Sequence, residues 1–242
     1  MKKLFFLAIF AVFSFGAELK IAAAANMSYA LDELKKEFLK THPNDEIQII
    51  TGASGKLSTQ IQNGAEYDIF ISADEKFPKA LNEAGFSLNT PKIYAKGVLA
   101  MISAHKNELS FENLKNVKSI VIANPKTAPY GTAALEALKN SGIYESIKNK
   151  IIESGSISEA LSQTLSAADV GFSALSLLKA PKMSHLKENE NYIKVPSNLY
   201  SPINQAMIVL KSSKNQSLAL EFCDFILSDK GKEILVNFGY EF

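Results

Sequence analysis

The stretch TGASGKLSTQI, residues 51–61, places small, hydroxyl-bearing and basic residues where a helix is expected to begin. It follows the apolar run EIQII, which predicts a strand, so Lys56 stands where a phosphate loop carries its lysine. The spacing excludes that loop, because Gly52 and Gly55 enclose two residues instead of four and Leu57 follows Lys56. What remains is the chemistry of a helix start, whose unpaired N–H groups and hydroxyl protons favour an anion.

Small, polar loops of similar composition precede other expected helices. They are AANMS at 24–28, SAD at 72–74, APYGT at 128–132 and SGSIS at 154–158. Each has a simpler interpretation, since Ser, Asn and Asp are common N-caps and Gly is common in turns. Capping alone does not require so many small residues, which let a ligand approach the backbone closely. The loops together therefore predict an anion site, with Lys56 as a solvated surface lysine.

A repeated order of apolar strand, short polar loop and amphipathic helix predicts an α/β fold. Three such units begin at ELKIAAAA, EIQIITG and YDIFISA, and three more at SIVIANP, KIIES and DVGFSA. A late strand, NQAMIVL at 204–210, and two helices, SLALEFCDFIL and DKGKEILVNFG, are expected to return to the first series.

The two series predict two α/β lobes with a ligand cleft between them. The first lobe is expected to contain residues 18–96 and 204–242, and the second lobe residues 97–203. Two crossing segments, near 95–100 and 199–206, would join them. Ligands of open α/β sheets bind beyond the carboxyl ends of the strands, where all the polar loops lie.

The first residues predict export. Two lysines precede an apolar run from Leu4 to Phe15 that ends in small residues, as in a secretory signal peptide. Residues 1–17 are therefore predicted to be removed on the way to the periplasm, with cleavage after residue 16 or 17 left open. The run is too short to span a membrane, which takes about 20 residues.

The charge, cysteine count and apolar content of the sequence limit which classes of protein it can belong to. Without the two leader lysines, 24 of the 26 basic residues face 25 acidic ones, so no electrostatic case for nucleic acid exists. The single cysteine, Cys223, lies in an apolar-periodic helix and is predicted to be a buried core thiol. An apolar content of 47% is ample for a packed core.

No motif for catalysis is complete. GFSAL at 171–175 approaches a nucleophile elbow, but Leu175 replaces its closing glycine, and Asp74 is predicted to cap a helix. No pair of His or Cys residues has metal-ligand spacing. The histidines lie in polar stretches outside the loops: His42, His105 and His185. The chain is therefore predicted to be no enzyme and to carry no cofactor.

Four segments in order carry a family resemblance over essentially the whole exported chain: AAAANM, GASGKLSTQI, YDIFISAD and NPKTAPYGTAALEAL. The chain resembles the periplasmic molybdate-binding proteins of ABC transporters, which have the type II periplasmic binding-protein fold. The resemblance implies a monomer that captures molybdate, and tungstate with it, and delivers it to a membrane permease. Molybdenum would be present only as the bound oxyanion.

Carried over to this sequence, the resemblance implies oxyanion contacts from Asn26, the Ser54 hydroxyl and the backbone at Ala73. The second lobe would add Tyr130 and the backbone at Ile157. Some members have Ser at the position of Asn26, and some use a Tyr where this chain has Ala174, so the tyrosine role moves to Tyr130. Whether Ala174 lies near the ligand is left open. The alternatives are sulfate or another tetrahedral oxyanion on the same fold, and a secreted α/β enzyme.

Overall fold

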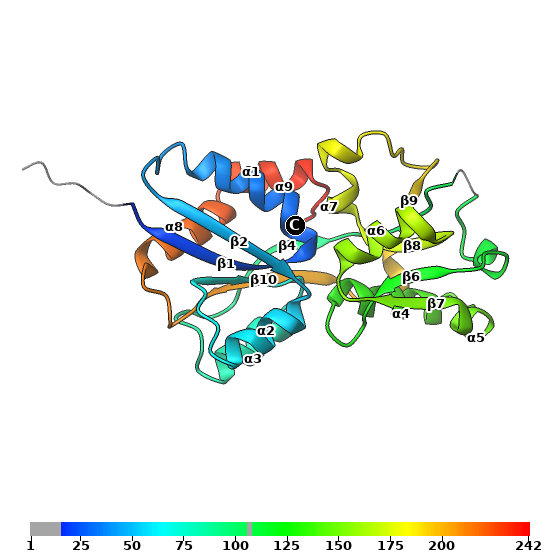
Figure 1. Cartoon of the computed structure of the whole chain (residues 1–242), viewed down its shortest axis with the longest axis horizontal. Helices are drawn as coiled ribbons and strands as arrows, with labels where there is room; N and C mark the ends of the chain where they lie inside the picture. The colour runs from blue at the N-terminus through cyan, green and yellow to red at the C-terminus, as the bar shows by residue number, and fades with distance from the viewer. Residues whose placement is uncertain (1–15, 106–107) are drawn as a thin grey trace, which may run out of the picture.

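The structure, a computed structural model, describes residues 16–105 and 108–242. It contains two five-stranded sheets, with strand orders β2-β1-β3-β10-β4 and β7-β6-β8-β5-β9. Figure 1 shows each sheet with its own helices, side by side along the long axis of the molecule. The first lobe is named here for the sheet containing β1 and the second lobe for the sheet containing β6. The predicted signal peptide, apart from Gly16 and Ala17, lies outside the described residues.

The first lobe is a mixed sheet in which β1 runs parallel to β2 and β3, whereas β10 runs antiparallel to β3 and β4. Its strands are β1 (Glu18–Ala24), β2 (Glu46–Gly52), β3 (Ile69–Ile71), β4 (Lys92–Gly97) and β10 (Ile203–Val209). Its helices are α1 (Ser28–Phe38), α2 (Ser54–Gln62), α3 (Lys76–Glu83), α8 (Gln216–Leu227) and α9 (Asp229–Asn237). The short 3-10 turn η1 (Ala25–Met27) joins β1 to α1.

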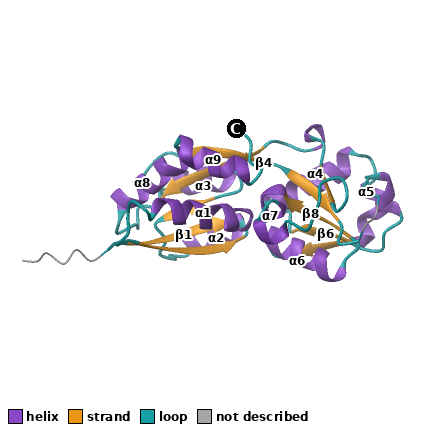
Figure 2. Cartoon of the chain, turned by 90° about the horizontal axis from the view of Figure 1, so that it is seen from above, coloured by secondary structure: helices purple, strands orange, loops and turns teal. Residues whose placement is uncertain are grey.

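The second lobe has the same kind of sheet, with β6 parallel to β7 and β8, and β5 antiparallel to β8 and β9. Its strands are β5 (Leu99–Ile102), β6 (Ile120–Ala123), β7 (Ile151–Ser154), β8 (Val170–Ala174) and β9 (Tyr192–Lys194). Its helices are α4 (Pro129–Asn140), α5 (Tyr144–Ile147), α6 (Ile157–Ala167) and α7 (Leu175–Leu178). Figure 2 shows helices on both faces of the sheets.

Successive side chains of β1 point to opposite faces of the sheet, and the core of the first lobe is therefore divided into two clusters. Leu19, Ile21 and Ala23 face the cluster that α1, α8 and α9 cover. Ala22 faces the other cluster, which α2 and α3 cover. A parallel strand buried on both faces is apolar at successive positions, and this explains the run IAAAA that follows Lys20.

Cys223 lies within the first of these clusters and is 1% exposed. Burial raises the pKa of its thiol to about 12. The prediction of a buried core thiol is confirmed.

The predicted α/β fold with two lobes is confirmed, and the late strand joins the first sheet as expected. The sequence pattern missed β9, and it treated the crossing near 95–100 as a connection. That crossing is the end of β4 and the start of β5, with Val98 alone between the two sheets. The helix expected over LSLLKAP is shorter, since α7 ends at Leu178 before Pro181. Proline cannot continue a helix, and it disfavours helical backbone in the residue before it.

The C-terminal segment returns to the connection between the lobes. The N–H of Lys96 donates to the carbonyl of Glu241 (2.7 Å), and the N–H of Glu241 donates back to Lys96 (2.9 Å). Figures 1 and 2 both show the C-terminus near the middle of the long axis. In residues 16–105 and 108–242 there is no helix of the length and apolarity that crossing a membrane requires.

Candidate functional site

A small cavity lies between the lobes, at the carboxyl ends of the parallel strands. Its volume is about 10 Å³, about what one buried water molecule requires. The lining comes from the loops after β1, β2 and β3 and from the starts of α4 and α6. The lining residues are Ala24, Ala25, Asn26, Gly52, Ala53, Ser54, Ala73, Ala128, Pro129, Tyr130 and Ile157.

All five residues predicted for the site therefore lie around one cavity, although they come from five separate loops. Ala174 is not among the described residues that line it. Ala174 instead ends β8, fully buried, and precedes α7. The five loops that were predicted to form an anion site therefore meet at one cavity. What this cavity can bind depends on the direction of each hydrogen-bonding group around it.

The hydroxyl of Ser54 is held by the neighbouring loop. The Ala73 N–H donates to Ser54 Oγ at 3.0 Å, so the hydroxyl oxygen is an acceptor there and its own proton is left to donate. Ser54 makes no side-chain cap for α2, which removes the capping interpretation. The Ala73 N–H, expected to contact the oxyanion directly, positions Ser54 in this structure.

The start of α6 leaves a particular N–H group for the cavity. Ser156 caps the helix by accepting the Glu159 N–H (3.2 Å), and the Glu159 carboxylate accepts the Gly155 N–H (3.1 Å). The arrangement is a variant of a capping box, in which the Glu159 carboxylate accepts the N–H of the residue before the cap instead of that of the cap itself. The N–H of Ile157, the first residue of the helix, has no acceptor within the helix. The backbone at Ile157 is therefore suited to an anion.

Both side-chain N–H groups of Asn26 donate to acceptors within the protein. Its Nδ2 donates to Oε1 of Gln205 and to the hydroxyl of Tyr240, both at 2.9 Å. Its Oδ1 has no hydrogen-bond partner among the described residues. In this arrangement the Asn26 side chain has no N–H left for an oxyanion, which differs from the contact that the resemblance implied.

Tyr130 reaches from α4 to the first lobe. Its hydroxyl accepts a hydrogen bond from Gln205 Nε2 at 3.0 Å. Gly97 makes room for this pair, because a Cβ at that position would overlap both the tyrosine oxygen and the amide nitrogen. Burial raises the pKa of Tyr130 well above its usual value, so the hydroxyl stays neutral and keeps its proton at physiological pH.

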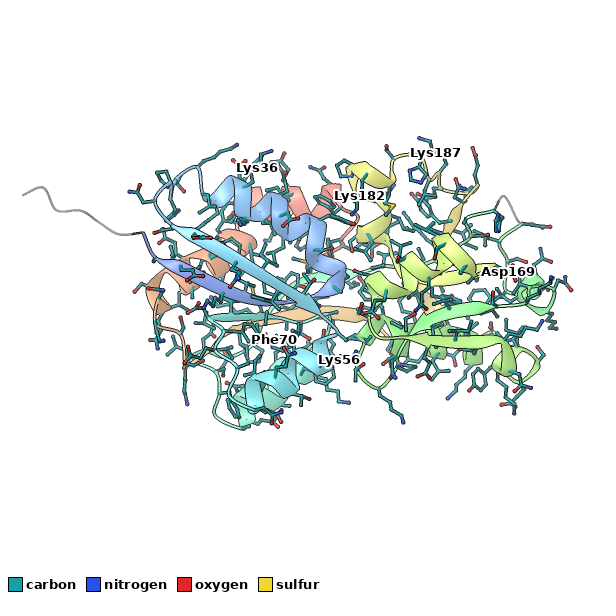
Figure 3. The ribbon with its side chains drawn as sticks, viewed as in Figure 1. Lys36, Lys56, Phe70, Asp169, Lys182 and Lys187 are labelled. Carbon is teal, nitrogen blue, oxygen red and sulfur yellow. The ribbon has the colours of Figure 1, made fainter. Side chains whose placement is uncertain are left out.

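Charge is kept out of the cavity. Within residues 16–105 and 108–242 no charged side chain lines it. Lys56 is exposed, as predicted. Figure 3 places Lys56 on α2, near the second lobe, and its ammonium group approaches Gly155. Asp74 was predicted to cap a helix, but the N-cap of α3 is Glu75, which makes no side-chain cap. Asp74 lies one residue earlier and accepts hydrogen bonds from Ser72 Oγ and from the Phe77 N–H in the first turn.

Direct hydrogen bonds join the lobes around the cavity. The Gly55 N–H donates to the Thr127 carbonyl (2.9 Å). Ser158 and Ser176 of the second lobe donate to the carbonyls of Ala25 (3.1 Å) and Asn26 (2.9 Å). These bonds, with the one from Gln205 to Tyr130, enclose the cavity between the two lobes.

The supporting residues behind the cavity escaped sequence reasoning. Gln205, Tyr94 and Tyr240 are each at most 3% exposed, yet they lie in segments that read as ordinary strands or as the chain end. A signal existed for Gln205, because a glutamine inside the apolar run NQAMIVL must have hydrogen-bond partners if that strand is buried. Among the described residues, no group of three or more His, Cys, Asp or Glu side chains is placed to hold a metal ion.

Comparisons with known proteins agree with this arrangement. A family described as bacterial extracellular solute-binding protein matches residues 19–241. The molybdate-binding protein ModA of Azotobacter vinelandii is 33% identical over 93% of this chain and 90% of that protein. ModA of Rhodobacter capsulatus is 32% identical, over 92% and 88%. The solved structure of the periplasmic molybdate-binding protein of A. vinelandii has a TM-score of 0.86, at 33% identity, covering 93% of this chain and 99% of that one.

The chain belongs to the bacterial extracellular solute-binding proteins. Its two mixed sheets with flanking helices form the type II periplasmic binding-protein fold.

The buried hydroxyls make the stability of the fold sensitive to alkaline pH. Burial raises the pKa values of Tyr94, Tyr130 and Tyr240, whereas unfolded tyrosines ionise near pH 10. Above about pH 10 the unfolded chain binds fewer protons than the folded chain. The free energy of unfolding should then fall by up to about 1.4 kcal/mol per pH unit for each tyrosine. Cys223 adds a slope of the same sign.

Urea unfolding of the ligand-free protein between about pH 8 and 11 measures this slope. The contribution of the tyrosines should be complete below about pH 9 and should decline above it, and the loss from Cys223 should begin about one pH unit lower. A Tyr94→Phe variant should show a shallower decline. A free energy of unfolding that stays constant to pH 11 would contradict the burial of these hydroxyls.

Proposed function

We propose that this chain is a periplasmic binding protein that captures molybdate, and tungstate with it, and delivers the oxyanion to the permease of an ABC importer. The observation that carries the proposal is the uncharged cavity lined by the starts of helices from both lobes. The two relatives named above, which align along nearly the whole chain, are molybdate-binding proteins.

Neutral donors suit a tetrahedral dianion. The Ser54 hydroxyl, the Tyr130 hydroxyl and the N–H of Ile157 are donors around the cavity, and hydrogen bonds to a charged group contribute about 1.5–3 kcal/mol each. The N-termini of α2, α4 and α6 add the partial positive charge of their dipoles. No carboxylate of the described residues lines the cavity, so a protonated phosphate would find no charged acceptor among them. Sulfate has the same charge as molybdate, and discrimination against it depends on cavity size.

Binding in this class of site requires the lobes to separate. We propose that residues 18–96 with 204–242 move as one body and residues 97–203 as the other, about the crossings near 95–100 and 199–206. The enclosing hydrogen bonds, such as Ser158 to Ala25, would break on opening. Each lobe supplies only part of the donor set, so closure completes the site.

The remaining proposals concern the protein in the cell. Residues 1–17 act as a cleaved signal peptide that directs the chain to the periplasm, where it works as a monomer without catalytic activity. The closed form is the one that the permease recognises. These proposals rest on the leader sequence and on the family to which the chain belongs.

Isothermal titration tests the cargo. We expect molybdate and tungstate to bind one per chain, and sulfate and phosphate to bind at least about a hundredfold more weakly, a difference of about 2.7 kcal/mol. Sulfate binding as tight as molybdate binding would refute the selectivity. Absence of binding by all four oxyanions would refute the class of function.

Ser54→Ala tests the proposed donor. The change removes one charge-assisted hydrogen bond to the anion, so affinity for molybdate should fall at least about tenfold. It also removes the acceptor of the Ala73 N–H, so the free energy of unfolding should fall by about 1 kcal/mol.

Ser58→Ala is the matched control, because Ser58 is buried one turn later on α2 and does not line the cavity. It should leave the affinity within about twofold of the parent value. Titration and thermal unfolding without ligand separate the two effects. A Ser54→Ala protein that binds as tightly as the parent would show that Ser54 is not a ligand donor.

A further inference from the structure

Gln205 is a fully buried carboxamide in the middle of β10, at a position where packing alone would favour an apolar side chain. It is 0% exposed. The register between β10 and β4 shifts between Gln205 and Ala206, and such a bulge redirects a side chain out of the regular pleat. Gln205 does not line the cavity, yet it contacts residues of both lobes that do.

Its three hydrogen bonds have defined directions. Oε1 accepts from Asn26 Nδ2 (2.9 Å) and from the Tyr94 hydroxyl (2.7 Å). Nε2 donates to the Tyr130 hydroxyl (3.0 Å). An amide oxygen only accepts and an amide nitrogen only donates, so the orientation of this one group decides what its neighbours can do.

For Tyr130 the consequence is the direction of its proton. A hydroxyl that accepts from Gln205 must direct its own O–H elsewhere. The side chain of Ser176 lies within hydrogen-bonding reach of Tyr130, but Ser176 is a neutral acceptor and its own proton goes to the Asn26 carbonyl. An oxyanion in the cavity is the stronger acceptor, because hydrogen bonds to a charged partner are roughly twice as strong.

For Asn26 the contact with Gln205 uses up a donor instead of leaving one free. Oε1 of Gln205 holds one side-chain N–H of Asn26, and Tyr240 holds the other. Asn26 is thereby fixed as part of the cavity wall, with no side-chain N–H free for an anion.

We propose that Gln205 is a positioning residue for oxyanion binding, which aims the Tyr130 hydroxyl proton into the cavity when the lobes close. The inference rests on the proposed function, since it concerns how that same cavity presents its donors. Because Gln205 lies on the first lobe and Tyr130 on the second, the donor is oriented only in the closed form. The residue thereby couples closure to the formation of the anion site.

A double-mutant cycle tests this directly. Gln205→Met keeps the length of the side chain and removes both polar atoms, and Tyr130→Phe removes the hydroxyl through which Gln205 is proposed to act. In the parent background Gln205→Met should weaken molybdate binding by about tenfold. In the Tyr130→Phe background it should weaken binding by less than about twofold, because the two effects are not additive when one residue acts through the other.

Tyr94→Phe is the control on the same carboxamide. It removes the hydrogen bond from Tyr94 to Oε1 and leaves the bond from Gln205 to Tyr130 in place. It should lower thermal stability while changing the affinity less than about threefold. If Gln205→Met does not fold, Gln205→Leu replaces it in the same cycle.

The possible results distinguish a failure of the positioning role of Gln205 from a failure of the proposed molybdate binding. Equal losses of affinity from Gln205→Met in both backgrounds would overturn the positioning role, because a packing defect does not depend on the Tyr130 hydroxyl. Tyr130→Phe that binds as tightly as the parent would overturn it as well. Failure of the parent protein itself to bind molybdate would instead refute the proposed function.

Discussion

A doubly charged oxyanion can leave water for a closed protein cavity only if the protein replaces its lost hydrogen bonds. Burying charge without compensation is very costly. In the proposed function the cavity meets this requirement with oriented dipoles instead of a counter-charge, because helix starts line it and none of the described residues brings a charged side chain to its wall. The rest of the structure serves to bring these dipoles to one point and to keep them pointing inward.

The fold provides the convergence. Parallel strands that end at one sheet edge deliver their loops together, and two such edges face each other across the cavity. Small residues such as Gly52 and Ala53 keep the backbone accessible, while Gly55 lets α2 approach the second lobe closely enough to bond the Thr127 carbonyl. A buried network then fixes proton direction, in which Gln205 connects Asn26, Tyr94 and Tyr130.

The sequence predicted the architecture because each strand, loop and helix carries its own local pattern, and it predicted the composition of the cavity wall because all the relevant loops share one chemistry. It did not predict Gln205, Tyr240 or Gly97, since their importance arises only when segments far apart in the sequence meet. Nor did it predict that the side-chain N–H groups of Asn26 would be taken up by Gln205 and Tyr240. Residue types are visible in a sequence, whereas hydrogen-bond direction is a property of the folded assembly.

The central claim is that a dianion is held between the lobes by neutral donors alone. A crystal structure of the protein with molybdate, located by the anomalous scattering of molybdenum, tests it most directly. The account predicts one tetraoxoanion between the lobes, with its oxygens about 2.7–3.1 Å from the Ser54 hydroxyl, the Tyr130 hydroxyl and the N–H of Ile157. An anion bound elsewhere, or held in that cavity by the ammonium group of Lys56, would contradict it.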